Sequence, residues 1–272
     1  MTEPYIRQHK TYPDEFPESW ASGWGEDEFG LWMAFTYKGA RQQFRWCEPG
    51  TFLMGSLEDE PERLSDENQH EVTLSKGFWI ADTTVTQALW EAVMGENPSD
   101  FKGENRPVEN VSWDDAQEFI GKMNDMKPEL KLQLPTEAQW EYACRAGSTT
   151  PFCWGEQVNS ELVNFDGTEP YNNGRKSEYR QETVDVESFY QNDWGLWQMH
   201  GNVYEWCQDW YGNYPSGLVV DPRGPESGDD RVLRGGSWIY GGRHCRSACR
   251  SGRDPADRDI IGIHGFRFAR GH

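Results

Sequence analysis

The sequence predicts a loop-rich fold that combines short strands with three helices around a core rich in aromatic rings. Three observations lead to this prediction. The 272 residues include 14 tryptophans and 28 glycines, helical periodicity is confined to three short segments, and residues 148–234 form an irregular stretch rich in Gly, Asn, Asp, Pro and aromatic residues. Large flat rings suit the filling of a core between loops. A hydrophobic content of 36% is enough for one large domain.

The first expected element is a hairpin near the N-terminus. We interpret the second half of the segment SWASGWGEDEFGLWMAFTYKG as an alternating strand, and a second strand-like segment, RQQFRWCEPGTFLMGS, follows it directly. Alternation with a period of two is typical of a half-buried strand. We therefore assign residues 1–43 to an N-terminal extension whose hairpin packs on the domain, and residues 44–272 to the domain itself.

Three helices are expected next, at residues 84–95, 112–126 and 135–147. Gly95 suits a C-cap of the first helix, because glycine adopts the left-handed conformation readily. Ser112 with Asp115, and Thr136 with Gln139, have the spacing of capping boxes that begin the second and third helices. The apolar residues of the second helix follow a helical period, so we expect one buried face.

The long irregular region after the third helix needs a fastening of its own in a compact domain. Short strand pairs, bound ions or buried tryptophans could each provide it. Six cysteines are present, and none lies in a C-x-x-C pair, so a zinc ribbon is not expected. Reduced, mostly buried thiols are expected instead.

The net charge of −20 argues against nucleic acid or an anionic membrane as the main partner, because both are polyanions. The mean hydropathy is −0.88, and no apolar run approaches the roughly 20 residues of a membrane span. The N-terminus, MTEPYIRQHKTYPDEFPESW, lacks the apolar core of a secretory signal. We therefore expect a cytoplasmic protein without a membrane span.

The charge is distributed unevenly along the chain. From Arg231 to the C-terminus there are nine Arg and three Asp, a net of +6 against −26 for the rest. This segment could form a basic face that meets an acidic ligand. Alternatively, its arginines could pair with the acidic remainder of the same chain. The sequence leaves both alternatives open.

Seven short segments, in their order and spacing, are similar to those of one family. They are PGTFLMGS (49–56), VTQALWEAVMG (85–95), RPVENVSWDDA (106–116), LPTEAQWEYACRAG (134–147), GLWQMHGNVYEWCQDWY (195–211), RVLRGGSW (231–238) and GFRFA (265–269). Together they resemble the formylglycine-generating enzyme (sulfatase-modifying factor) superfamily over about residues 44–269. The resemblance implies an α+β, C-type-lectin-like fold with little regular secondary structure, a small twisted antiparallel sheet and long ordered loops.

The resemblance implies three kinds of function. Some members are copper-dependent oxidases that convert a substrate cysteine to formylglycine, some are iron-dependent sulfoxide synthases, and some bind ligands without catalysis, including variable proteins diversified by retroelements. The iron-dependent members use three histidines. The six histidines here are scattered, and no H-x3-E-x-H pattern occurs.

The copper chemistry needs two thiolates, because Cu(I) prefers soft sulfur ligands. In the family these cysteines lie five positions apart after the RGGS motif, which here falls on Tyr240 and Cys245. Tyr240 offers no sulfur, so the implied catalytic pair is incomplete, although Cys245 and Cys249 could form a substitute pair. The resemblance also implies a disulfide partner for Cys144, and Cys245 is one candidate.

The resemblance further implies structural calcium, because MHGNVYEW (199–206) matches a family segment that wraps a Ca²⁺ ion with oxygen ligands. The implied ligands are the backbone carbonyls of His200, Gly201 and Val203, the carboxylate of Glu205 and, at a second site, Asn164 and Phe165. The alternative is that Glu205 caps or pairs with an arginine in a buried turn. Calcium would fasten the irregular region and take no part in chemistry.

The composition of residues 239–264 is unusual, because this segment contains no Lys, Glu, Gln, Met or Trp. Elsewhere these five types account for 69 of 246 residues, so about seven would be expected in a segment of this length. They are also residues that no codon ending in T or C can encode. Adenine-directed mutagenesis by a retroelement starts from AAC or AAT codons and yields a set of residues close to the one present.

A loop-rich scaffold can hold such a segment as a binding patch while its backbone stays fixed. The residues expected to form an exposed patch, near Trp210 and Trp238, are Ile239, Tyr240, His244, Cys249, Ser251, Asp254, Asp259, Ile260, Ile261 and His264. The sequence therefore favours a non-catalytic module that binds a protein or a small molecule through a variable C-terminal surface. The alternative is a copper- or iron-dependent oxidase that acts on a protein or thiol substrate, with Cys245 and Cys249 as its catalytic residues.

Overall fold

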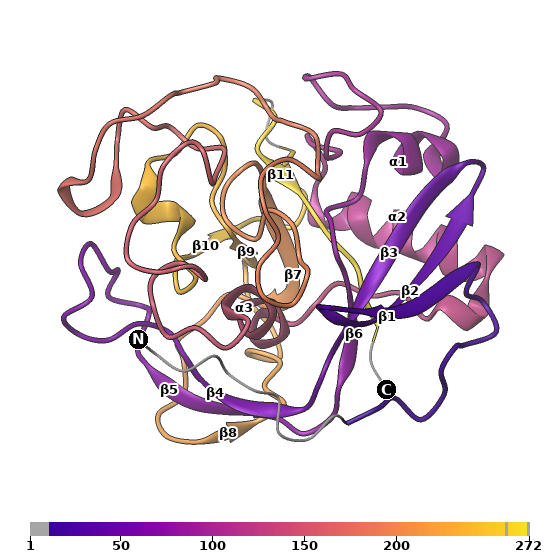
Figure 1. The fold of residues 1–272 in the computed structure, drawn as a ribbon, viewed down its shortest axis with the longest axis horizontal. Coiled ribbons are helices and arrows are strands. Elements are labelled where there is room, and N and C mark those ends of the chain that lie inside the picture. The colour runs from indigo at the N-terminus through magenta and orange to yellow at the C-terminus, as the bar shows by residue number, and fades with distance from the viewer. Residues whose placement is uncertain (1–10, 259–260, 271–272) are drawn as a thin grey trace.

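Regular elements are concentrated in the first half of the chain, and long loops occupy most of the second (Figure 1). The computed structural model describes residues 11–258 and 261–270. The helices in these ranges are α1 (Gln87–Met94), α2 (Trp113–Met126) and α3 (Glu137–Arg145), with 3-10 turns at Pro128–Leu130, Tyr171–Asn173 and Gly242–Cys245. The strands are β1 (Gly23–Asp27), β2 (Gly30–Tyr37), β3 (Ala40–Cys47), β4 (Gly50–Met54), β5 (His70–Leu74), β6 (Phe78–Ala81), β7 (Tyr204–Trp210), β8 (Val219–Val220), β9 (Arg231–Arg234), β10 (Arg250–Arg253), β11 (His264–Gly265) and β12 (Ala269–Arg270).

The strands form three small sheets. Five strands pair in the order β1-β2-β3-β6-β12, four in the order β10-β9-β7-β11, and three in the order β4-β5-β8. In the first sheet β2 and β3 form an antiparallel hairpin that turns at Lys38 and Gly39, with Tyr37 opposite Ala40. Because β3 crosses residue 43, the expected extension and the domain share one sheet. The boundary between them stays a prediction.

The helix starts follow the capping residues predicted from the sequence. The Ser112 hydroxyl accepts from the backbone N–H of Asp115, whose carboxylate accepts from the N–H of Ser112, and Thr136 and Gln139 form the same reciprocal pair. The first helix ends at Gly95, which has a φ of 85°. The third helix ends earlier than predicted, because Ala146 adopts the left-handed conformation one residue before glycine.

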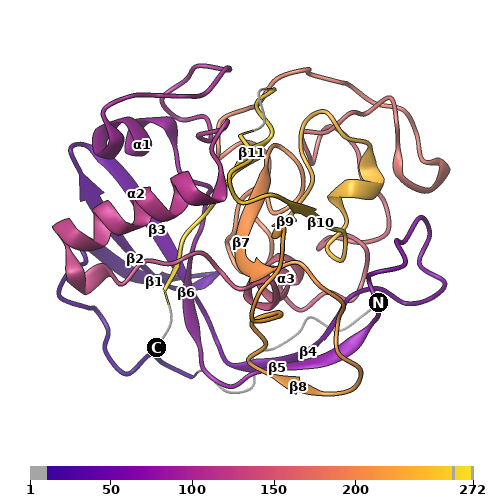
Figure 2. The same cartoon turned by 180° about the vertical axis from the view of Figure 1, so that it is seen from behind.

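The core is filled largely by aromatic rings, as the tryptophan content predicts. Figure 2 shows α2 lying across the five-stranded sheet. In the core on this side, Trp90 of α1 stacks on Phe119 of α2 with ring centroids 5.1 Å apart. A second core surrounds α3, where Trp140 is completely buried. Burying such large rings removes much apolar surface from water, which is the main source of stability here.

The irregular region is fastened by strand pairs and by buried side chains. Its strand β7 pairs with β9 and β11 in the second sheet. Trp206 is completely buried and donates its indole N–H to the Val111 carbonyl at 2.9 Å. Asn192 donates to the Ala143 carbonyl at 2.8 Å and so ties a loop to the end of α3. These contacts place the C-terminal segment on a fixed frame.

Candidate functional site

The arginines of the C-terminal segment are mostly internal. Four of them are at most 3% exposed, and each is paired with a buried glutamate from another part of the chain. The pairs are Arg234 with Glu141, Arg246 with Glu67 at 2.6 Å, Arg250 with Glu137 at 2.7 Å, and Arg267 with Glu205 at 2.6 Å. Buried charges of opposite sign hold each other in place, and loss of either partner is costly. Pairing within the chain is therefore the alternative that the structure confirms for these four arginines.

Two further arginines of this segment, Arg231 and Arg258, also have partners within the chain. Arg231 lies between the rings of Trp113 and Trp210, with its guanidinium carbon 3.9 and 3.4 Å from the two centroids. Such cation–π contacts fix both the ring and the cation. Arg258 pairs with Asp115 at 2.5 Å on the surface. Trp210, expected beside the binding patch, is thus committed to Arg231.

The structure divides the residues expected to form the patch into three groups. Ile239, Tyr240, His244 and Ser251 are half-buried, and Asp254 and Ile261 are exposed. Cys249 and His264 are 1% exposed, so the expectation of exposure is wrong for both. Cys249 directly precedes β10, and His264 lies in β11 against β7, so both point into the packed interior. Asp259 and Ile260 lie outside the described residues.

Aromatic rings line the part of the patch that reaches the surface. The Tyr240 ring contacts Tyr204 and His244 at centroid distances of 5.6 and 5.1 Å. Nearby, Trp238 stacks with Tyr179 and donates its indole N–H to the Gly262 carbonyl at 2.8 Å. Rings held by such contacts offer contact area at a low cost in conformational entropy.

The electrostatics of this surface are mild. Burial lowers the pKa of His244, and the nearby Arg243 and Arg246 lower it further, so the imidazole is neutral at pH 7. Asp254 is exposed and accepts the backbone N–H of Ala256 at 2.9 Å. The face formed by Ile239, Tyr240, His244, Ser251, Asp254 and Ile261, here called the C-terminal face, therefore combines neutral aromatic contacts with one carboxylate.

The cysteines of the alternative oxidase site are not open to solvent. Cys245 and Cys249 are buried free thiols. Burial raises the pKa of Cys249 to about 12 and that of Cys245 further, which disfavours the thiolate that binds copper and attacks substrates. Cys144 is also a free thiol, so the disulfide with Cys245 is absent here. The thiol lies 3.6 Å from Nε2 of His200.

The residues implied for calcium are engaged with protein partners. Both carboxylate oxygens of Glu205 accept from Arg267, at 2.6 and 2.7 Å, and one also accepts from the indole of Trp140 at 2.8 Å. This arrangement is the arginine pair considered as the alternative, and a carboxylate so committed does not fit a calcium ligand.

The other implied calcium ligands are backbone carbonyls and the side chain of Asn164. His200 Nδ1 contacts the Cys245 carbonyl at 2.7 Å, and burial lowers its pKa to about 4. The Oδ1 atom of Asn164 is buried without a partner, and Asn164 and Gly201 form a bridge between their backbones. In the described ranges no three His, Cys, Asp or Glu side chains gather into a metal site of their own. Calcium at the positions of Asn164, Phe165 and Val203 stays a prediction.

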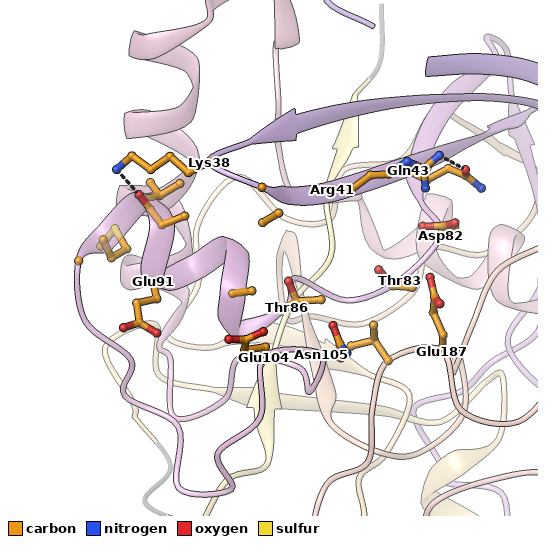
Figure 3. Close-up of a pocket in the computed structure, with 18 residues that line it drawn as sticks. Lys38, Arg41, Gln43, Asp82, Thr83, Thr86, Glu91, Glu104, Asn105 and Glu187 are labelled. Atoms are coloured by element: carbon orange, nitrogen blue, oxygen red, sulfur yellow. Dashed lines mark hydrogen bonds between the residues drawn. The ribbon is translucent and has the colours of Figure 1, made fainter. Parts of the chain in front are cut away.

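The sequence reasoning missed one carboxylate, Asp82, which directly follows β6. It is 6% exposed and lines a cavity beside the β2–β3 turn and helix α1 (Figure 3). A signal was available, because an aspartate after the apolar run FWIA is unexpected in a core.

No helix in the described part of the chain has the length and apolarity that a bilayer crossing requires.

Comparisons with known proteins identify the relatives of this fold. Residues 34–272 match the family model described as the sulfatase-modifying factor enzyme 1-like domain. The formylglycine-generating enzyme of Streptomyces coelicolor is 36% identical over 206 residues, which is 71% of this chain and 60% of that protein. The mouse (Mus musculus) enzyme is 34% identical over 215 residues, 75% of this chain and 54% of its own length. The chain thus spans little more than half the length of these relatives.

Two solved structures are similar over most of both chains. Treponema denticola variable protein 1 superposes with a TM-score of 0.74 at 27% identity, covering 88% of this chain and 98% of that one. PvdO from Pseudomonas aeruginosa gives a TM-score of 0.69 at 27% identity, covering 85% and 94%. The α+β fold of this family, predicted from the seven segments, is confirmed.

Proposed function

This chain belongs to the family of sulfatase-modifying factor enzyme 1-like domains. We propose that it binds a ligand without catalysing a reaction. The C-terminal face would contact a protein or a small molecule, while the paired arginines beneath it hold the backbone. The observation that carries this proposal is Tyr240, which stands at the position where copper chemistry requires sulfur. The two nearest cysteines in the sequence are buried with raised pKa values.

We further propose that the segment 239–264 is diversified by a retroelement. Its composition supports this, and so does the similarity to a protein that is named a variable protein. A genomic test is direct. An adenine-rich near-copy of the coding segment beside a reverse-transcriptase gene is the expected finding, and a lysine or glutamate codon among the differing positions of close relatives would contradict the proposal.

The alternative, a copper- or iron-dependent oxidase acting on a protein or thiol substrate, is favoured by the 34–36% identity to formylglycine-generating enzymes. It is tested by titrating the reduced protein with Cu(I) and following oxygen consumption with a cysteine-containing peptide. We expect neither a stoichiometric copper site nor turnover. Tyr240→Cys is expected to create no activity, and turnover by the wild-type protein would overturn the binding proposal.

Binding itself is tested by changing two residues of the C-terminal face. A variant with Tyr240→Ala and Ile261→Ala is compared with Glu71→Gln, a substitution at an exposed position of β5, in quantitative affinity capture followed by mass spectrometry. A partner retained by the wild type and by Glu71→Gln but lost by the double variant supports the proposal. Equal capture by all three proteins contradicts it.

A further inference from the structure

A cavity of about 1050 Å³ lies apart from the C-terminal face. Its walls come from the β2–β3 turn, the residues after β6, helix α1, and the loops at 104–105 and 186–187 (Figure 3). This volume is near the upper end of cavities that hold small organic molecules. None of its lining residues belongs to the segment 238–264, so whatever it binds is independent of the proposed function.

The charged side chains of this cavity are mostly acidic. They are Asp82, Glu91, Glu104 and Glu187 against Lys38 and Arg41. Both cations are hydrogen-bonded to uncharged groups of the cavity wall, because Lys38 donates to the Ala92 carbonyl at 2.8 Å and Arg41 donates to Gln43 at 2.7 Å. Among the described residues, none of the four carboxylates forms an ion pair. The cavity therefore presents unneutralised negative charge.

Asp82 is the carboxylate that distinguishes this cavity from an ordinary acidic surface. It is 6% exposed, and only its backbone is used, with its N–H donating to Gln43 and its carbonyl accepting from Trp197. Its side chain accepts no hydrogen bond from the described residues, and Figure 3 shows it facing the cavity toward Glu187. A buried carboxylate without a partner is costly unless a ligand supplies one.

The charged groups around Asp82 do not satisfy it from within the protein. Arg45, Arg267 and Arg41 stabilise its charge from a distance, while Glu187 opposes it. Arg45 is held by Asp27 at 2.6 Å, and Arg267 by Glu205. Because these arginines are committed elsewhere, burial dominates and raises the pKa of Asp82 to about 7.

The remaining walls indicate the shape of the missing partner. The lining also includes small apolar side chains, among them Ala40, Ala88 and Val186. Such a lining suits an aliphatic chain, whereas a bare metal ion would need several converging oxygen ligands. No such group of three acidic, His or Cys side chains occurs in the part of the chain that the structure describes.

We propose that this cavity binds an alkylammonium ion, with the ammonium group paired to Asp82 and the aliphatic chain running toward Glu187 or Glu104. The same chemistry could come from a free diamine or from the lysine side chain of a peptide. A diamine fits the four carboxylates best, because its second ammonium would reach the exposed glutamates at the mouth. The neutral aliphatic segment would cover the alanines of the lining.

Isothermal titration calorimetry with putrescine, and in parallel with Nα-acetyl-lysine methylamide, tests the proposal. The proteins are the wild type, Asp82→Asn and the control Glu71→Gln. The control removes one exposed carboxylate from β5, so its net charge equals that of Asp82→Asn. We expect one equivalent of putrescine to bind the wild type, a loss of roughly thirtyfold or more for Asp82→Asn, and no change for Glu71→Gln. Wild-type affinity should rise between pH 6 and 8 as Asp82 ionises, and the Asp82→Asn protein should lack this rise.

Several outcomes would overturn the proposal. They are the absence of binding by either amine at millimolar concentration, an equal loss in both variants, and equal binding of the uncharged analogue 1-butanol. Binding of the lysine derivative alone would assign the cavity to a peptide side chain, and binding of putrescine alone would assign it to a free diamine. Circular dichroism of each variant verifies folding, which the isosteric change at Asp82 should preserve.

Discussion

Two regions of this molecule treat buried charge in opposite ways. Under the C-terminal face, each of four buried arginines meets a buried glutamate. In the cavity beside α1, the buried Asp82 meets no cation closely. Both regions take charge out of water, which is expensive. The difference is that the buried charges of the first region are paired within the chain, whereas the proposed partner of Asp82 is a ligand.

This contrast separates structural charge from functional charge. The abundant arginines near the C-terminus resemble an anion-binding surface in the sequence, but their role is to hold loops together over long distances in the chain. Arg246 and Glu67, for example, are 179 positions apart. Asp82, which follows β6, does not stand out in the sequence. Its side chain nevertheless accepts no hydrogen bond from the described residues and is free to bind a ligand.

The largest effect is expected where a buried pair is broken. Glu141 is completely buried and accepts from Arg234, from Arg145 and from the backbone N–H of Gly55. Glu141→Gln removes the paired anion of Arg145 and the nearer of the two anions of Arg234, whose other partner is Glu137 at 3.4 Å, and should lower the free energy of unfolding by about 3–5 kcal/mol. Urea denaturation measures this, with Glu71→Gln expected to stay within about 0.5 kcal/mol of wild type. A loss below about 1 kcal/mol would remove the distinction between the two regions.

The second-largest effect is expected for Asp82→Asn, which should raise the free energy of unfolding and not lower it. The pKa of Asp82 is about 7 in the folded protein against 3.8 as the reference value, so the folded state holds its proton more tightly than the unfolded state does. Stability from this group is complete below pH 3.8 and is lost as the pH rises through 7. Asp82→Asn removes that loss and should stabilise the protein at pH 8 by up to about 4 kcal/mol.

The quantity to measure is the difference in free energy of unfolding between Asp82→Asn and the wild type. Measured by urea unfolding at pH 4, 6 and 8, it should be close to zero at the lowest pH and grow with each step. Because the other carboxylates titrate identically in both proteins, their contributions cancel. A difference that does not change with pH would show that Asp82 is already paired.

Much of the fold could be predicted because its signals are local. The capping boxes at Ser112 and Thr136 lie within four residues, and the hairpin alternation lies within two neighbouring segments. The end of the third helix was missed because Ala146, which has a penalty for the left-handed conformation, adopts it before the available glycine. Here tertiary packing outweighed local preference.

The site could be predicted only in part, because burial depends on partners that are remote in sequence. Composition correctly marked Ile261 and Asp254 as exposed, yet the same composition placed Cys249 and His264 beside them, and both are buried. Their burial follows from the pairing of β11 with β7 and of β10 with β9. No local sequence pattern predicts which strands pair. The choice of partner for each arginine is undetermined by the sequence for the same reason.

The smallest effect is expected for an ion pair that belongs to the C-terminal segment but lies on the surface. The Arg258 side chain is 65% exposed and pairs with Asp115 at 2.5 Å. Water and salt screen such a pair, so Arg258→Ala should cost no more than about 1 kcal/mol, and less at high salt. Urea denaturation at 0.05 and 0.5 M NaCl measures this. A cost equal to that of Glu141→Gln would show that burial does not determine which charges stabilise this fold.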